Sequence, residues 1–317
     1  MKKQLLIAAV AATMTSVAMA DISITGATKV NYTTVDFDGT TDSTNNFTHA
    51  VDLAITGKTG DTTVVVKLGN IEDAGGTGIN IEDSYLTTKV SDVSIKAGTW
   101  DNGNNALRAS SRATNKLSAS TTMGGLTITG NANSDTTGMG QSVKVAGSAS
   151  GVTASYEDTA SGETIKLSTA VAGVNVSYLA INSDTAASDR NVIEVSGKVG
   201  GMGVKVAKAT ADASASIGGD TWMGDFEVAA GDTGAYQLSN GQDVTSIEVS
   251  TSMAGNTVKF RNTSVDDVAG ANMSFNKIIL TRPLANGTTF EATYTDLDDS
   301  VAANDSSTLD LELAVKF

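Results

Sequence analysis

The sequence predicts an all-β protein, a transmembrane antiparallel β-barrel of roughly sixteen to eighteen strands with short periplasmic turns and long external loops. Three observations predict it. Apolar and polar residues alternate along most of the chain, as in strands that have one apolar and one wet face. Short and long connections follow each other in alternation between these runs. The chain ends on an alternating strand, Ser307 to Phe317, which a closed barrel would pair with its first strand.

The N-terminus has the pattern of a secretory signal peptide. Lys2 and Lys3 form a basic start, a short apolar run begins at Leu5, and Ala18-Met19-Ala20 is a small-x-small cleavage site. We therefore expect residues 1–20 to be removed and residues 21–317 to form a single β-barrel domain in the bacterial cell outer membrane. No later apolar run is long enough for a transmembrane helix.

The alternation begins directly after this segment. Ile22, Ile24, Val30 and Tyr32 share one face, and polar residues take the other. The same pattern, followed along the chain, predicts strands over 22–35, 47–58, 62–69, 82–90, 93–100, 117–123, 126–133, 142–150, 152–158, 164–171, 174–182, 191–199, 203–211, 243–253, 256–264, 273–283, 288–297 and 307–317. Two hairpins have weaker patterns, so sixteen strands is an alternative.

The connections separate into two kinds. Short ones have the chemistry of tight hairpin turns, as at Ser150-Gly151, Ala172-Gly173 and Ala254-Gly255. Long, polar and often acidic connections are expected near residues 38–46, 70–80, 101–116, 134–141, 159–163, 183–190, 212–242, 265–272 and 298–306. Short turns at one end and long loops at the other are typical of an outer-membrane barrel.

The polar faces of the predicted strands carry charge. A charge that faces lipid costs roughly 2–4 kcal/mol at the bilayer midplane, so these side chains must face water. A barrel of this size encloses an aqueous lumen that would satisfy them. The expected pore-wall residues are Lys29, Asp52, Lys67, Lys96, Lys144, Lys166, Glu194, Lys198, Glu248, Lys259, Arg261, Glu291, Asp310 and Glu312. The solvated face of a soluble sandwich would explain this alternation too, but not the sorted loops or the terminal Phe317.

The composition excludes several functions. The chain has 35 acidic and 21 basic residues and a net charge of −14, which disfavours nucleic acid as a partner. It has no cysteine and one histidine, His49, so disulfides, zinc or haem sites and a Ser-His-Asp triad are not expected. We therefore expect no cofactor and no enzymatic activity. The acidic segments 265–267 and 296–299 are either sites for divalent cations or simply solvated loops.

One hairpin and the loop behind it resemble a known family. Residues 83–100 place Tyr85 near the start and Gly98 near the end of a hairpin, and the long loop 101–116 follows. This layout is similar to that of the general trimeric porins of Gram-negative bacteria. The resemblance implies a passive diffusion channel for small hydrophilic solutes and ions, a homotrimer in outer-membrane lipid, and a terminal Phe317 that serves the barrel-assembly machinery as an assembly signal. Two features depart from the family: aromatic residues make up only 5% of the chain, and the strand count exceeds sixteen.

In that family the third external loop folds inward and narrows the channel. The corresponding loop here contains more bases than acids although the chain is acidic, and Asn102 lies among its polar residues. The residues expected at a pore constriction are Asp101, Asn104, Asn105, Arg108, Arg112 and Lys116. Rings of Arg and Lys are typical of anion pores, so we expect a weak anion preference. The other interpretation is a solvated loop whose charges do nothing specific.

A second function remains open at this point. A secreted β-rich surface protein, such as an adhesin or a surface-array subunit, would have the same Thr-, Asn- and Gly-rich acidic composition. Extraction distinguishes the two, since only a barrel needs detergent to leave the membrane.

Overall fold

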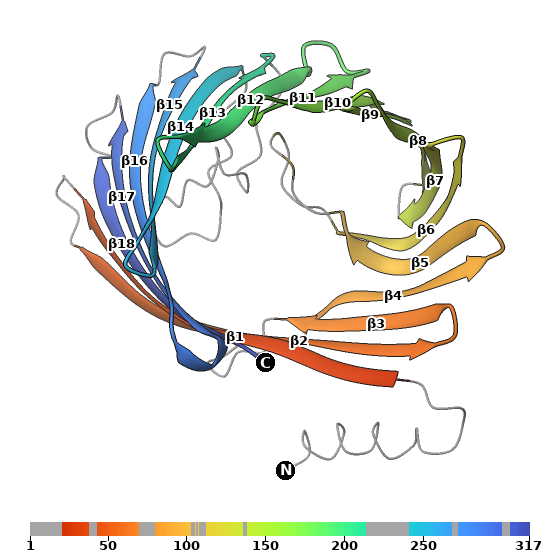
Figure 1. Cartoon of the computed structure of the whole chain (residues 1–317), viewed down its shortest axis with the longest axis horizontal. Coiled ribbons are helices and arrows are strands. Elements are labelled where there is room, and N and C mark those ends of the chain that lie inside the picture. The colour runs from red at the N-terminus through yellow and green to blue at the C-terminus, as the bar shows by residue number, and fades with distance from the viewer. Residues whose placement is uncertain are drawn as a thin grey trace.

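Eighteen strands form one antiparallel sheet that closes on itself (Figure 1). The computed structural model describes residues 21–37, 43–69, 80–102, 105, 107, 112–135, 138–213, 241–267, 272–299 and 305–317. Each strand pairs with the strands before and after it in the sequence, and the last strand pairs with the first. The expected signal peptide, residues 1–20, lies outside the described residues.

The strand bounds follow the alternation in the sequence. The strands are β1 (Asp21–Phe37), β2 (Thr44–Thr59), β3 (Thr62–Gly69), β4 (Asn80–Val90), β5 (Val93–Asp101), β6 (Arg112–Met123), β7 (Leu126–Asp135), β8 (Gly138–Ala149), β9 (Val152–Thr159), β10 (Gly162–Val171), β11 (Val174–Ser183), β12 (Arg190–Val199), β13 (Met202–Ala211), β14 (Gln242–Met253), β15 (Asn256–Asp267), β16 (Met273–Pro283), β17 (Thr288–Asp299) and β18 (Ser306–Lys316). One 3-10 turn, η1 (Ala285–Gly287), joins β16 to β17.

The predicted strands are all present, and the count of eighteen is confirmed. The alternative of sixteen strands is wrong, because all eighteen strands are paired with both neighbours in one sheet. Among the described residues no helix is long and apolar enough to span a bilayer.

The first and last strands close the ring. Their register runs from Ala27 opposite Lys316 to Phe37 opposite Ser306. Beyond it, Gly26 and Phe317 exchange both backbone hydrogen bonds, with N···O distances of 2.8 and 3.0 Å. The seam therefore leaves no unpaired edge between β1 and β18, as expected from the alternating C-terminus.

The short turns match their sequences. Ser150-Gly151, Ala172-Gly173 and Ala254-Gly255 each have positive φ at both residues, the conformation of a type I′ hairpin turn. At the opposite end, two connections expected to be long, near 134–141 and 159–163, contain only two residues each, because β7 runs to Asp135 and β10 starts at Gly162. The error has a physical reason: strands that continue past the apolar belt carry polar residues on both faces, and a polar strand end resembles a loop in sequence.

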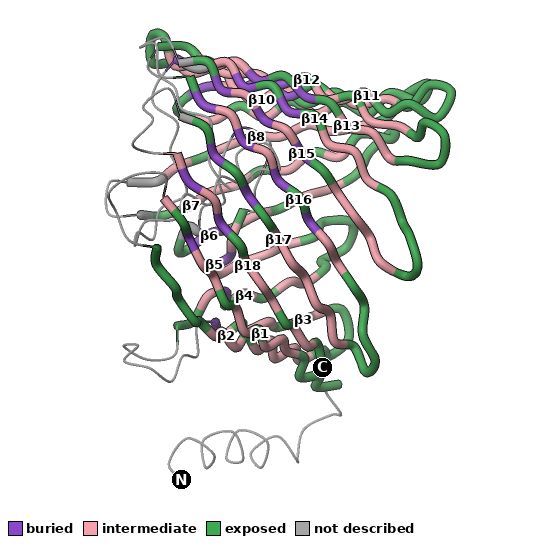
Figure 2. The backbone as a smooth tube through the Cα atoms, turned by 90° about the vertical axis from the view of Figure 1, so that its left-hand side faces the viewer, coloured by how far each residue is buried: buried purple, intermediate pink, exposed green. Residues whose placement is uncertain are grey.

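The register assigns every strand residue to one of two faces. Residues paired directly across strands share a face, and successive residues alternate. One face of the ring holds large apolar side chains that are exposed, such as Ile24, Phe47, Leu167 and Phe260. The strands are oblique to the axis of the ring, and buried residues recur at intervals along β14 to β18 (Figure 2). The outer face of the barrel is therefore an apolar belt, and the other face lines the lumen.

Candidate functional site

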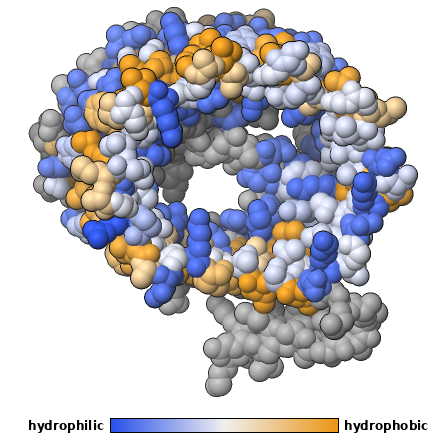
Figure 3. All heavy atoms as spheres, viewed as in Figure 1, coloured by the Kyte–Doolittle hydropathy of each residue, from blue (hydrophilic) through white to orange (hydrophobic). Residues whose placement is uncertain are grey.

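The candidate site is the lumen enclosed by the ring. The space-filling view shows an opening between the side chains inside the ring (Figure 3). Residues on the inner face form cross-strand rows, and one such row passes through Lys205, Glu248, Arg261 and Lys277. Charged side chains thus lie side by side on the wall of this passage.

The expected pore-wall residues share this inner face. The cross-strand register connects them around the ring, strand by strand, without a change of face. The residues are Lys29, Asp52, Lys67, Lys96, Lys144, Lys166, Glu194, Lys198, Glu248, Lys259, Arg261, Glu291, Asp310 and Glu312. The register also places charged residues there that the sequence analysis did not single out: Lys58, Asp83, Lys89, Glu157, Arg190, Lys205, Lys277 and Lys316.

Basic residues outnumber acidic ones on the inner face, although the chain as a whole has a net charge of −14. Among strand residues whose side chains the structure describes, only Lys208 and Arg282 are basic and face outward. The outward-facing acidic residues lie toward the ends of the strands with the longer connections: Asp36, Asp158, Glu163, Asp243, Asp266, Asp296 and Asp298. The wall of the lumen is therefore net basic in an acidic protein.

Ion pairs neutralise much of the acidic charge on the wall. Arg261 donates from Nε and Nη2 to one oxygen of Glu248, at 3.1 and 2.7 Å. Weaker pairs have N···O distances between 3.1 and 3.9 Å: Lys205–Glu194, Lys29–Glu312 and Lys144–Glu157. Each pair cancels one basic and one acidic charge, so the excess of bases on the wall remains after pairing.

A cluster of lysine and aromatic side chains lies on β3 to β6, where the connection between β5 and β6 begins. We call it the root cluster, and it consists of Lys67, Asp83, Tyr85, Lys96, Trp100 and Lys116. Its two rings meet edge to face, with centroids 6.3 Å apart. The ammonium nitrogen of Lys96 lies 3.9 Å from the Tyr85 centroid and 4.5 Å from that of Trp100.

Lys116 closes the root cluster from β6. Its Nζ lies 4.2 Å from the Trp100 ring centroid, donates to the Trp100 carbonyl oxygen at 3.1 Å and donates to Oδ1 of Asn102. The side chain is almost fully buried, so its charge is compensated by these contacts and not by water. Lys116 therefore ties the strand after the loop to the residues before it.

Asp83 ties the same region to β3. Its carboxylate accepts from Lys67 Nζ at 2.7 Å and from the backbone N–H of Asp101 at 3.1 Å. The Asp83 side chain is 5% exposed, whereas that of Lys67 is 47% exposed. The last residue of β5 is thus fixed by a buried carboxylate from β4, the other strand of the same hairpin.

The local backbone requires glycine at position 98. Gly98 has φ of 132° next to a register shift between β5 and β6, and a Cβ there would collide with the carbonyl oxygen of Ser84. Trp100 lies on the inner face with Lys96 and beside Tyr85, while the extra residue of the irregularity lies on β6, between Ala113 and Lys116.

The connection itself is shorter than expected from the sequence. Asp101 ends β5, and both Arg112 and Lys116 belong to β6, so the loop spans residues 102–111 rather than 101–116. The alternation in 112–116 is weak because polar residues occupy both faces, which explains the error. Asn105 and Leu107 are described within the loop, whereas Asn104 and Arg108 lie outside the described residues.

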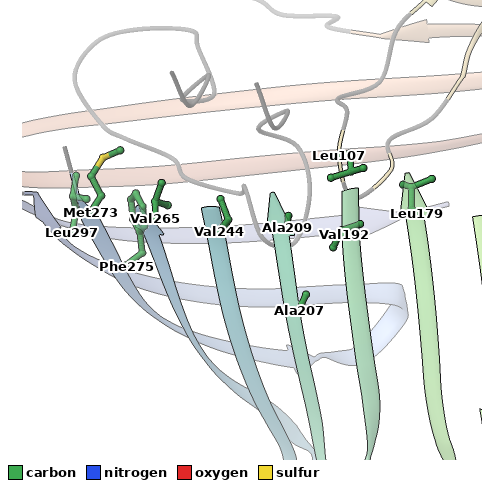
Figure 4. Close-up of a cluster of buried hydrophobic side chains, with 10 residues drawn as sticks. All are labelled: Leu107, Leu179, Val192, Ala207, Ala209, Val244, Val265, Met273, Phe275 and Leu297. Atoms are coloured by element: carbon green, nitrogen blue, oxygen red, sulfur yellow. The ribbon is translucent and has the colours of Figure 1, made fainter. Parts of the chain in front are cut away.

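A continuous apolar row occupies the inner face of β11 to β16. We call it the apolar shelf, and it consists of Leu179, Val192, Ala209, Val244, Val265 and Met273, each paired with the next across the strands. Ala207, Phe275 and Leu297 extend it toward the middle of the wall (Figure 4). The sequence analysis missed the shelf. Its only signal is that adjacent residues are both apolar, as in Val192-Ile193, which removes the contrast between faces.

Comparisons with known proteins identify the fold. No family model matches the sequence, and no curated protein matches it. Solved structures match over nearly the whole chain. Pseudomonas aeruginosa OccK3 (OpdO) is 13% identical, with 94% of this chain and 96% of that chain covered and a TM-score of 0.68.

Two further solved structures agree. Acinetobacter baumannii OccAB4 is 9% identical, with 94% of this chain and 98% of that chain covered and a TM-score of 0.66. A BenF-like porin from Pseudomonas fluorescens Pf-5 is 12% identical, with the same coverage and a TM-score of 0.67. The expected likeness to outer-membrane porins is thus confirmed at the level of the fold, with eighteen strands in this chain.

Proposed function

We propose that the protein is an outer-membrane porin that allows small hydrophilic solutes and ions to diffuse passively, without catalysing a reaction. One observation carries the proposal: a closed ring of eighteen strands has an apolar outer face and a charged inner face around an opening (Figure 3). A closed ring is one of the two structures that satisfy every backbone group in lipid. Charged inner walls need water, and a water-filled ring conducts ions.

The outer face argues against a secreted adhesin or array subunit. Phe47 is 66% exposed and Ile24 is 54% exposed, and similar side chains continue around the barrel. A soluble protein rarely exposes apolar surface that extends this far. We expect the protein to stay with membranes through a high-salt wash and to leave them only with detergent. Release by salt alone would favour the secreted alternative.

Conductance in planar bilayers tests the channel itself. The sample is detergent-purified protein whose electrophoretic mobility still shifts on heating, which demonstrates a folded barrel. We expect stepwise current increases as single proteins insert. A heat-denatured sample from the same preparation is the control. A folded, membrane-inserted sample without conductance would contradict the proposal.

The loop between β5 and β6 is proposed to narrow the passage, and Arg108 and Arg112 to add to an anion preference there. Lys116 is buried in the root cluster, where its charge is compensated, so the proposed preference depends on the two arginines. We expect Arg108→Ala combined with Arg112→Ala to move the reversal potential toward cations and to raise the conductance slightly. An unchanged reversal potential and conductance would mean that this loop does not control the passage.

Phe317 is proposed to serve assembly by closing the seam. Its ring lies over Gly26, where an added Cβ would be 2.6 Å from Cζ of the ring, and the two residues exchange backbone hydrogen bonds. We expect deletion of Phe317 to lower the amount of heat-modifiable barrel in the membrane. Gly26→Ala should lower it as well, because the added Cβ would collide with the ring and lie 2.8 Å from the carbonyl oxygen of Asp52. Normal barrel levels after the deletion would contradict the role.

Three partners are proposed. Contact with the barrel-assembly machinery follows from the proposed role of Phe317. A homotrimer follows from the family resemblance, and cross-linking in native membranes measures it. Divalent cations at external acidic loops follow from segments such as 296–299, whose Asp296 and Asp298 face outward on β17. The mass of the protein in mild detergent gives the oligomeric state, and a monomeric mass would contradict the homotrimer. The same measurement with a chelator shows whether the assembly depends on divalent cations.

A further inference from the structure

The apolar character of the shelf is unexpected on a wall that faces water. Side chains that line an aqueous lumen should be polar, as they are on the rows nearer the short turns. Yet Ala209, Val244 and Val265 face the lumen and have no exposed surface. Something must cover them, and one member of the same buried cluster does not come from the wall at all. That member is Leu107, from the loop between β5 and β6.

Leu107 reaches the shelf through the lumen and not along the wall. The cluster contains residues of β11 to β17 and Leu107, but no described residue of β6 to β10, the strands that separate the two regions around the ring (Figure 1). In the close-up, Leu107 lies beside Val192 and near Leu179 (Figure 4). The six Cα–Cα steps from Asp101 to Leu107 can span up to about 20 Å when extended.

The local backbone presents Leu107 to the shelf. Oδ1 of Asn105 accepts a hydrogen bond from the Leu107 N–H at 2.8 Å, the two-residue contact by which Asn stabilises a turn. The Leu107 side chain is fully buried there. At the other end, Asp83 and Lys116 fix the residues on either side of the loop. The chain between them is therefore held at two points.

We propose that Leu107 is the positioning residue that anchors the constriction loop to the apolar shelf, so that the width and steadiness of the channel depend on this one apolar contact. The inference rests on the proposed channel function. Loss of the contact frees the loop from the shelf while the root cluster and the barrel stay intact. The channel should then be wider and its current noisier.

Thiol cross-linking tests the docking without any transport measurement. The chain has no cysteine, so the double variant Leu107→Cys with Val192→Cys introduces the only two thiols. A short bis-maleimide should join them and change the mobility of the denatured protein. The matched control pairs Leu107→Cys with Ser155→Cys, an inner-face position on β9 outside the shelf. We expect several-fold more cross-linked product for the shelf pair.

Conductance tests the anchoring. Leu107→Asn keeps the branching at Cγ but is smaller and polar, and it adds no charge, so an altered current cannot arise from an added charge. We expect a higher single-channel conductance and more frequent fluctuations. Leu107→Met keeps an apolar side chain and should behave as wild type. Cross-linking the double variant Leu107→Cys with Val192→Cys should make fluctuations of its single-channel current less frequent.

The outcomes separate the two proposals. Equal cross-linking of the shelf and control pairs overturns the docking of Leu107, whether or not the protein conducts. Preferential cross-linking with unchanged conductance in Leu107→Asn overturns the anchoring role. A folded protein that never conducts overturns the proposed function, and the cross-link still reports on docking. If the first pair does not fold, Leu107→Cys with Ala209→Cys tests the same contact.

Discussion

The root cluster and the apolar shelf hold the two ends of one loop by different chemistry. At the root, a buried carboxylate, three lysines and two aromatic rings fix the residues around the loop. At the shelf, six apolar side chains from six strands receive a single leucine. Directional contacts set the position where the loop leaves the wall, while a non-directional apolar contact holds its far part. Each end can therefore be broken separately.

The largest effect is expected at the shelf. Val244→Asp places a carboxylate where the side chain has no exposed surface, and the charge finds no described basic partner in the row. An uncompensated buried charge costs roughly 3–5 kcal/mol. We expect a clear drop in the urea midpoint of the folded barrel in detergent.

Ser250→Asp is the matched control for that change. Ser250 lies on the same strand and inner face, opposite Lys259, where a carboxylate gains a basic neighbour. Its urea midpoint should stay close to that of the wild type. Equal loss in both variants would show that the shelf is not a dry apolar surface.

A smaller effect is expected from Asp83→Ala at the root. The change removes the acceptor for the Asp101 N–H and the partner of Lys67, and an unsatisfied buried group costs roughly 1–3 kcal/mol. Lys67 is half exposed and can turn to water, so the lower part of this range applies. Asp83→Asn keeps an oxygen for the N–H and should lose less. Denaturation in urea checks the order; an Asn variant as weak as the Ala variant would assign the whole effect to charge.

The smallest effect on stability is expected from Trp100. Trp100→Leu removes the ring face shared by Lys96 and Lys116, and such contacts are worth about 0.5–2 kcal/mol. Trp100→Phe keeps a weaker ring and should fall between Leu and wild type. The same urea titration gives the ranking, and a Leu variant as stable as wild type would mean that the lysines at the root do not depend on the ring.

The sequence predicts the root better than the shelf, and the reason is physical. Alternation alone identifies Lys67 and Lys96 as inner-face residues, because a charged side chain contrasts with its apolar neighbours. Lys116 was expected in a loop, since the register shift after Gly98 is invisible in a two-residue period. The shelf has no such contrast, as in Val192-Ile193, and Leu107, which packs against it, is far away in the sequence. Alternation indicates which face of the sheet a residue lies on, but not which distant residue packs against it across the lumen.

The reversal potential of the wild-type channel in a salt gradient tests the basic lumen most directly. The protein has a net charge of −14, which would favour cations, whereas the inner face carries more bases than acids, which would favour anions. Charges farther from the ion path than about 8–10 Å are screened at moderate salt, so the wall should dominate. The expected result is a reversal potential shifted toward that of chloride. A shift toward the potassium potential would show that the outer acidic residues, and not the lysines of the wall, control the passage.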